Sequence, residues 1–330
     1  MSGMLRQPRL NVLANGVPMA GAVSATVSSN NYHAADRFHV SVAAATAGAL
    51  LDADTIMLDL QFSLDGGASF AGAISGYVDT VELDAGSGRI GFSGRDLSAA
   101  LIEARTQETF ANQTASEIAT LLAERHGLST QVAATTTPAG RYWELEHDRL
   151  MLNAFTQATA EWDLLVSLAQ HEGFDVWVSG STLYFQPQQP DAPAIIRPEN
   201  CVSLRLERAL TLAGDVEVIV KSWHSRGGIG CTQSARRQGS GKGVRYIYVV
   251  PNLTPDQALT LAQRRLNELT RHERVLVAEM PGDMVLTPRM ALALEGTGTG
   301  FDTAYRIDEI ERTLSLGQGF VQRVRARVAA

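Results

Sequence analysis

Apolar and polar residues alternate along much of residues 8–95, and this period of two is typical of antiparallel strands that are buried on one face. In the clearest stretch one face holds Ile56, Leu58, Leu60, Phe62 and Leu64, while Asp59, Gln61 and Ser63 occupy the other. The dipeptide Asn15-Gly16 between two such stretches favours a tight hairpin, because both residues tolerate positive φ. Residues 8–95 therefore predict about six strands with short turns, in a small barrel or sandwich.

The period changes to that of helices after residue 96. Thr114 and Glu117 have the spacing of a capping box, in which each side chain binds an otherwise unpaired backbone N–H. Gly127 stands where a left-handed C-terminal cap is favoured, so a helix is predicted over 114–126. A second helix is predicted over about 152–171, because the apolar residues of this stretch share one face. Short strands are predicted over 174–178 and 183–185.

The β pattern resumes in the last part of the chain. Residues 186–198, QPQQPDAPAIIRP, are rich in Pro and Gln and are predicted to be a linker. The Gly-rich, basic segment 225–243 is predicted to be a long loop, and Thr254 is predicted to cap a helix that ends near Arg271. Further strands are predicted at 216–223, 244–250, 275–279, 290–294, 305–314 and 320–328.

These patterns predict a mainly β protein with an α+β insert. The expected domains are a first antiparallel β-barrel over residues 1–96, a small α+β domain over 97–190, and a second β-barrel over 191–330. The second barrel would contain the helix at about 255–271. A chain of 330 residues is too long for one ordinary core, which agrees with several domains.

Composition and charge narrow the class of protein. With 45% hydrophobic and 19% charged residues, the chain is expected to be a soluble globular protein. No apolar run approaches the roughly 20 residues of a membrane helix, so we expect no membrane insertion and no signal peptide. Residues 1–200 contain 22 Asp or Glu against 10 Arg and no Lys, whereas residues 201–330 contain 18 Lys or Arg against 13 acids. An acidic first part does not suit a protein that grips nucleic acid, but it suits a surface that nucleic acid passes without binding.

The densest polar cluster is Glu144, Glu146, His147 and Asp148. On a strand the three carboxylates would share one face, where they could hold a metal ion or act as paired acids. No second convergent set lies nearby, so a solvated strand is the better interpretation. Four Lys or Arg make the 225–243 segment either a contact for an acidic partner or neighbouring subunit, or a surface hairpin.

The remaining candidate residues favour structural roles. His126 and His171 each lie near a predicted helix C-terminus, where an imidazolium meets the negative end of the helix dipole. Cys201 and Cys231 are far apart and are expected to be two reduced thiols. The four tryptophans are expected to anchor cores or interfaces: Trp143, Trp162, Trp177 and Trp223. We therefore predict no catalytic, cofactor-binding or metal-binding residue.

One stretch resembles a known family. A strand containing Ile90 and Phe92 runs into Gly94-Arg95-Asp96, a helical segment "SAALIEA" follows, and after a polar spacer comes "IATLLAERHGL". This order of segments is similar to that of the late control protein D and hub proteins of phage tail baseplates, which are related to the first part of type VI secretion spike proteins. The resemblance covers most of the chain. No lysozyme segment or spike extension is recognisable.

The resemblance implies a virion structural protein of a contractile injection system or related phage tail. Such hubs are homotrimers whose two tail-tube-like barrels per chain form a pseudo-sixfold ring. The implied partners are the central spike protein, the tail tube or distal tail protein and a tape measure protein, and DNA passes through the ring at ejection without specific binding. The implied location is the tail tip or baseplate, after assembly in the host cytoplasm, with no cofactor.

We therefore expect a structural adaptor rather than an enzyme. Our hypothesis is that Asp52, Asp54 and Asp59 belong to an acidic surface that borders the DNA channel. Two other functions stay open: a cell-wall hydrolase or carbohydrate-binding tail protein that uses the Glu144–Asp148 cluster, and the hub of a bacteriocin-like or secretion particle.

Overall fold

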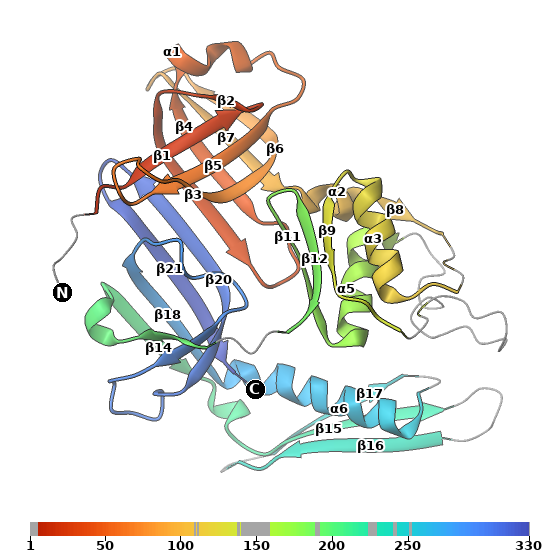
Figure 1. Ribbon diagram of the computed structural model, residues 1–330. Coiled ribbons are helices and arrows are strands. Elements are labelled where there is room, and N and C mark those ends of the chain that lie inside the picture. Colours follow the sequence, from red (N-terminus) through yellow and green to blue (C-terminus); the bar gives the residue numbers. More distant parts are fainter. Residues whose placement is uncertain are drawn as a thin grey trace. The chain divides into compact units, whose positions relative to one another are not determined.

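The computed structural model describes residues 6–108, 110, 112–136, 139, 159–188, 192–223, 230–239, 243–250 and 253–329 (Figure 1). The fold is mainly β, as the alternating pattern predicts. Its residues form two compact units. The first comprises Met1–Pro190, Met280–Pro288 and Glu309–Arg323, and the second Asp191–Glu279, Arg289–Asp308 and Val324–Ala330.

Antiparallel strands in a curved sheet make up most of the first unit (Figure 1). In chain order these are β1 (Arg9–Ala14), β2 (Val17–Pro18), β3 (Ala22–Asn30), β4 (Arg37–Ala43), β5 (Met57–Ser63), β6 (Ala71–Asp84) and β7 (Arg89–Asp96). The Glu309–Ser315 part of β20 (Ala304–Ser315) pairs with β3, and the spatial order is β20-β3-β4-β7-β6-β5-β1-β2. Short helical turns α1 (Ala44–Ala47) and η1 (Gly48–Leu50) follow β4.

The core of this sheet follows from the alternation in the sequence. Leu58, Leu60 and Phe62 of β5 point inward and are fully buried, as predicted, together with Val40 and Val42 of β4. Burying one such side chain contributes about 1.5–3 kcal/mol. The ring of Phe320, from β21 (Gly319–Val328), packs 4.7 Å from that of Phe62. The predicted hairpin at Asn15-Gly16 is also present, with both residues at positive φ between β1 and β2.

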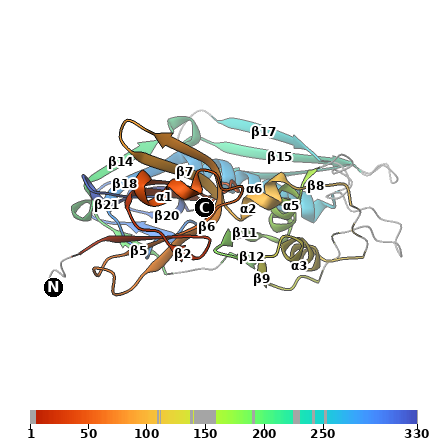
Figure 2. The same ribbon diagram turned by 90° about the horizontal axis from the view of Figure 1, so that it is seen from above.

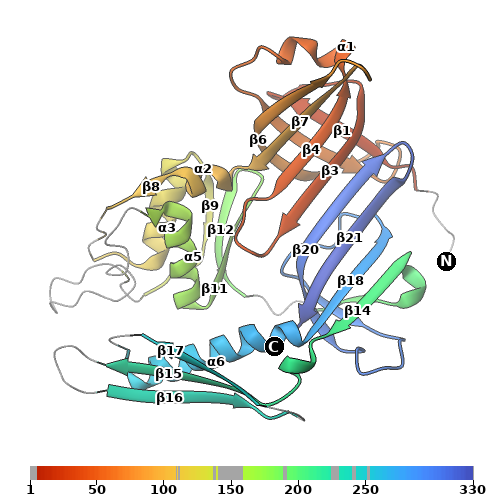
Figure 3. The same cartoon turned by 180° about the vertical axis from the view of Figure 1, so that it is seen from behind.

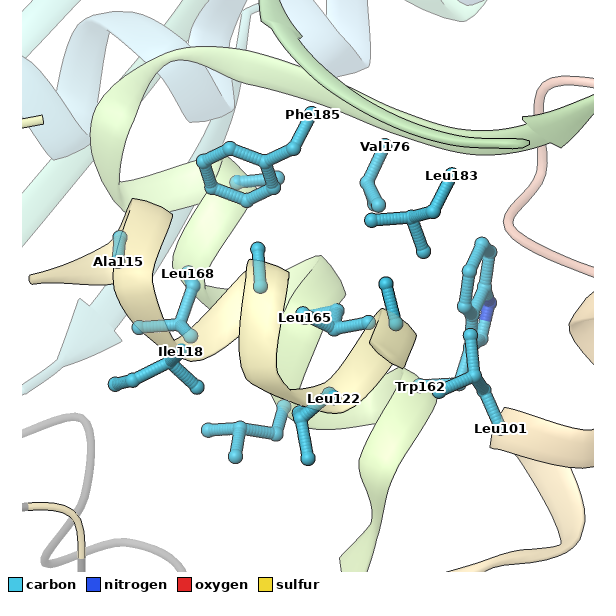
Figure 4. Packing of buried hydrophobic residues seen from close by; sticks show 14 of the residues in the cluster. Leu101, Ala115, Ile118, Leu122, Trp162, Leu165, Leu168, Val176, Leu183 and Phe185 are labelled. Carbon is cyan, nitrogen blue, oxygen red and sulfur yellow. The ribbon is translucent and has the colours of Figure 1, made fainter. Parts of the chain in front are cut away.

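The second part of the first unit is α+β. It contains α2 (Ser98–Glu103), β8 (Arg105–Thr106), α3 (Ala115–Arg125), β9 (Ser129–Val132), β10 (Thr159–Ala160), α5 (Glu161–Glu172), β11 (Phe174–Ser179) and β12 (Thr182–Pro187). Strand β12 lies between β11, which is antiparallel to it, and β9, which is parallel (Figure 2). Side chains from this sheet, among them Val176, Leu183 and Phe185, meet helix residues such as Ile118 and Leu165 in one buried cluster (Figure 4).

The two predicted helices of this part are present, with one correction. Thr114 and Glu117 form the predicted capping box of α3, and Gly127 and Gly173 adopt the positive φ of C-terminal caps. The prediction of helix from about residue 152 is wrong at 159–160, because these residues pair with β8 as β10 and α5 begins at Glu161. Residues 152–158 lie outside the described residues.

The second unit contains two sheets. One runs in the order β14-β18-β21-β20 and is extended by β19, which pairs with β20, and by β13. The other has the order β16-β15-β17, and α6 covers one of its faces (Figure 3). The bounds are β13 (Ala194–Ile196), η2 (Pro198–Asn200), β14 (Ser203–Arg208), η3 (Leu210–Leu212), β15 (Val216–Trp223), β16 (Gly230–Arg237), β17 (Val244–Val249), α6 (Pro255–Thr270), η4 (Arg271–Glu273), β18 (Arg274–Pro281) and β19 (Ala291–Leu294).

Two segments differ from their predictions. Residues 230–237 were expected in a long loop but form β16, because each of them pairs with a residue of β15. Residues 194–196 were expected in a linker but form β13, which pairs in parallel with β19. The helix α6 begins at the predicted Thr254–Gln257 capping box. No helix among the described residues is long and apolar enough to cross a membrane.

Candidate functional site: strand edges and charged surfaces

The Gly-Arg-Asp motif joins the curved sheet to the α+β part. Gly94 on β7 has no room for a side chain, because a Cβ there would lie 2.2 Å from the carbonyl oxygen of Tyr77 and 2.5 Å from the Phe38 ring. On the neighbouring strand, a Cβ on Gly76 would lie 1.9 Å from the carbonyl oxygen of Arg95. The glycines of this motif therefore allow β6 and β7 to approach closely at the point where the chain leaves the sheet.

Arg95 and Asp96 hold the same junction by charge and hydrogen bonds. The Arg95 guanidinium donates to Asp79 at 2.7 Å and to Glu103 of α2 at 2.6 Å. This contact holds the pKa of Asp79 below its ordinary value. The Asp96 carboxylate is buried and accepts the Ser98 hydroxyl at 2.6 Å, and burial, followed by the nearby charge of Asp36, raises the pKa of Asp96 to about 7. The motif thus has a structural role.

A second charged group links the two helices of the α+β part. Glu161, the first residue of α5, is only 2% exposed, and its carboxylate accepts a 2.6 Å hydrogen bond from Arg125. The ring Nε2 of His126, the C-cap of α3, lies 2.6 Å from the other oxygen of Glu161. Basic groups at a helix C-terminus and an acid at a helix N-terminus both complement the helix dipole, so this group stabilises the packing of α3 against α5. His126 lies at the C-terminus of α3 and His171 in the last turn of α5, the positions that the sequence predicts.

The other predicted candidates either lie outside the described residues or have no catalytic neighbours. Glu144, Glu146, His147 and Asp148 lie outside the described residues, as does Trp143. No group of three or more metal-ligating side chains occurs among the described residues. Cys201 and Cys231 are free thiols in different elements. Trp162 anchors the buried cluster of the α+β part and donates from Nε1 to the carbonyl of His33 at 2.7 Å, Trp177 stacks on Tyr184, and Trp223 is exposed.

Three of the acidic residues of the first part lie on β5 or in the segment before it. Asp52 and Asp54 are exposed in the segment before β5, and Asp59 is partly exposed on β5, opposite Leu13 and Ser75 on its neighbours. The position of Asp59 is the one that alternation predicts, because it lies on the face opposite the buried Leu58 and Leu60.

The end of β6 forms an open strand edge. β5 pairs with β6 only from Ala71 to Tyr77, whereas β7 pairs with β6 as far as Asp84. Residues 79–84 therefore have a neighbour on one side only among the described residues. This β6 edge carries Asp79, Glu82 and Asp84, and Leu83 is exposed on it. Glu82 has no basic partner in the described part of the chain.

β14 is a second open edge, and its exposed charged residues are Arg205, Glu207 and Arg208. It is the terminal strand of its sheet in the second unit and pairs only with β18. Arg208 donates to Glu273 at 3.1 Å, whereas Arg205 is exposed and has no acidic partner among the residues described. Val202 and Leu210, just before and after the strand, are strongly exposed. The sequence analysis predicts the strand β6 but misses β14, and it predicts neither edge, because an edge depends on which distant strand is absent beside it.

Among the described residues, the open edges of β6 and β14 suit association with another protein chain. An open strand edge presents unpaired backbone N–H and C=O groups, and natural proteins cover such an edge or use it for association. His39 Nδ1 on β4 lies 2.9 Å from the Ser93 hydroxyl on β7, but no carboxylate is hydrogen-bonded to that ring and no convergent set of acids is assembled among the described residues.

No protein-family model and no curated protein matches the chain. Several solved structures match its fold. A tail protein from Neisseria meningitidis MC58 superposes with a TM-score of 0.74 at 14% identity, over 97% of this chain and 96% of that one. The chain has the fold of phage tail proteins.

Other tail proteins share this fold. The 43 kDa tail protein of prophage MuSo2 from Shewanella oneidensis matches with a TM-score of 0.68 at 15% identity, over 97% of this chain and 98% of that one. The E. coli c3393 protein, a type VI secretion component with structural similarity to the phage T4 tail proteins gp27 and gp5, matches with a TM-score of 0.58 at 11% identity, over 97% of this chain and 77% of that one. The tail-protein fold thus extends over nearly the whole chain, which agrees with the resemblance of its Gly94–Asp96 region to tail hubs.

Proposed function

We propose that the protein is the structural hub of a phage tail tip or baseplate. Three copies close into a pseudo-sixfold ring that adapts the tail tube to the central spike and surrounds the DNA exit channel. The observation that carries this proposal is the tail-protein fold, which spans 97% of the chain. The spike, a tail tube or distal tail protein and a tape measure protein are the proposed partners.

Closing a ring requires heterologous contacts, in which one surface of a copy meets a different surface of the next. The β6 edge and the β14 edge are the two surfaces that we assign to this contact. Glu82, on the first edge, has no basic partner among the described residues, and Arg205, on the second edge beside the exposed Glu207, has no acidic one. Pairing between copies would satisfy the backbone groups of both edges and cover the exposed Leu83 and Val202.

Charge reversal tests this assignment. Glu82→Arg and Arg205→Glu should each lower the trimer fraction measured by light scattering, because like charges then meet across the contact, and the two together should restore it. Glu124→Arg, on the exposed face of α3, is the matched control. Trimers that persist in both single variants would refute the choice of edges, and a wild-type chain that never forms trimers would refute the ring.

The ring has no enzymatic role in this proposal. Incubation of the purified chain with peptidoglycan should release no fragments, and turnover that is lost in Glu144→Gln would favour the cell-wall hydrolase instead. The similarity to a type VI secretion component supports a second candidate, the hub of a secretion or bacteriocin-like particle. Mass spectrometry of purified particles separates the two, because a phage hub copurifies with capsid proteins and a secretion hub does not.

A further inference from the structure

The sheet β16-β15-β17 has an edge that differs from those assigned to the ring. The backbone N–H of Val244 donates to the carbonyl oxygen of Asp215, just before β15, and that of Val250 donates to the carbonyl oxygen of Lys221 on β15. Tyr246 and Tyr248 alternate with the outward residues in the same way, so their backbone groups also face β15. The backbone groups of Arg245, Ile247 and Val249 point away from it, and no described strand lies on that side.

The side chains at this edge are exposed and apolar. Ile247 is 54% and Val249 58% exposed, and Trp223 at the end of β15 is 49% exposed. The helix α6 covers the opposite face of the sheet and packs mainly over β15 and β16 (Figures 1 and 3). Tyr246 and Tyr248 on the helix side of β17 are consequently only partly buried. Residues 244–249 contain no proline and no buried charge, the usual devices that block strand addition.

Two ion pairs and one lysine without an acidic partner in the described part of the chain lie beside the edge. Arg245 binds Glu217 at 2.7 Å, and Arg265, which lies 5.5 Å from the centre of the Tyr248 ring, binds Glu268 at 2.8 Å. Lys221 pairs in register with Val249, is exposed, and has no acidic partner among the described residues. A strand added beyond β17 would lie about 10 Å from β15, which Lys and Glu side chains can span together.

We propose that the β17 edge is the docking site for an extended segment of a partner protein, rich in β-branched and acidic residues. The segment adds a strand to the β16-β15-β17 sheet, and its backbone pairs with Arg245, Ile247 and Val249. Main-chain hydrogen bonds supply affinity in this mode of recognition, and alternate side chains supply specificity. An acidic residue of the segment compensates Lys221. The inference does not rest on the ring, because a single copy carries the whole edge.

Amide hydrogen exchange of the full chain tests the proposal with a synthetic eight-residue peptide of alternating valine and glutamate. At a peptide concentration of ten times its Kd, exchange at Arg245, Ile247 and Val249 should slow by about ten-fold. A peptide with lysine in place of each glutamate, and one with a central proline, should leave these amides unchanged. Equal protection by the basic peptide, or no protection by the acidic one at millimolar concentration, would overturn the proposal.

Two variants separate docking at the edge from other binding. Ile247→Pro removes an outward N–H without removing a hydrogen bond to β15 and should abolish protection at Arg245 and Val249, whereas Ile247→Thr keeps the N–H and should bind. Should Ile247→Pro fail to fold, Lys221→Glu, at an exposed position, should reverse the preference to the basic peptide. Unchanged binding in these variants contradicts the proposal. If these amides become protected as the protein concentration rises, with no peptide present, the edge binds a second copy of the chain, and the proposal of a different partner protein is wrong.

Discussion

At the scale of single residues, contacts at the end of β7 explain why the fold has glycine, arginine and aspartate at positions 94–96. Gly94 and Gly76 are required by contact, since backbone atoms of the neighbouring strand occupy the space of a side chain. Arg95 and Asp96 then bind Glu103 and Ser98, the last and first residues of α2. The motif fixes the exit of the chain from β7.

Substitution of either glycine should therefore destabilise the protein. Gly76→Ala should lower the free energy of unfolding by about 1–3 kcal/mol, because the strands must separate to admit the methyl group. Gly72→Ala is the control, since it lies on the same strand with no atom within 4 Å of the new Cβ. Urea denaturation measures both, and equal midpoints would contradict the close approach.

Asp96 should make stability depend on pH. Its pKa is raised from 3.8 in the unfolded chain to about 7 in the folded protein, so the folded state binds the proton more tightly. The contribution is fully present below pH 3.8 and is lost as the pH rises to about 7. The slope approaches about 1.4 kcal/mol per pH unit within this window. Asp96→Asn keeps an acceptor for Ser98 and should remove this slope. The free energy of unfolding, measured by denaturation between pH 4 and 8, checks this. An equal dependence on pH in the variant and the wild type would contradict a raised pKa of Asp96.

At the scale of elements, the helices of the α+β part depend on the buried Glu161. Glu161→Ala leaves Arg125 and His126 without their shared acid and should destabilise the protein by about 1.5 kcal/mol, the lower value for a hydrogen bond to a charged group, because Arg125 is partly exposed to water. Glu124→Ala, at an exposed position on α3, should change stability by less than about 0.5 kcal/mol. Thermal unfolding compares the two, and similar values would show that the buried ion pairs contribute little.

Local signals predict the elements whose stability is local. The capping boxes at Thr114 and Thr254 fix the starts of α3 and α6, and alternation places β5 with Leu58 and Leu60 buried, because these interactions lie within a few residues of one another. Strands β13 and β16 could not be predicted. β13 (Ala-Ile-Ile) is too short to show an alternation and lies between prolines, and β16 (GCTQSARR) has no alternating apolar residues, so both become recognisable as strands only through their pairing with β19 and β15. Open edges are undetectable for the same reason.

At the scale of the whole molecule, the acidic first part should influence the passage of DNA. Charge reversal of Asp52, Asp54 and Asp59 together is expected to slow genome ejection while particles still assemble, because DNA would bind a basic channel border. The matched control reverses Glu124, Asp163 and Glu199, three exposed acids outside the segment 52–59. The rate of ejection is measured as DNA release from purified particles. A rate equal to that of the wild type would contradict the assignment of these residues to the channel border.

The central claim is that three copies of this chain close into a ring, and the mass of the purified protein in solution tests it most directly. Light scattering at several concentrations, with and without the spike protein, should give three times the chain mass of 35.5 kDa, plus the mass of the bound spike where it is present. A mass of 35.5 kDa at every concentration, with and without the spike, would contradict the account.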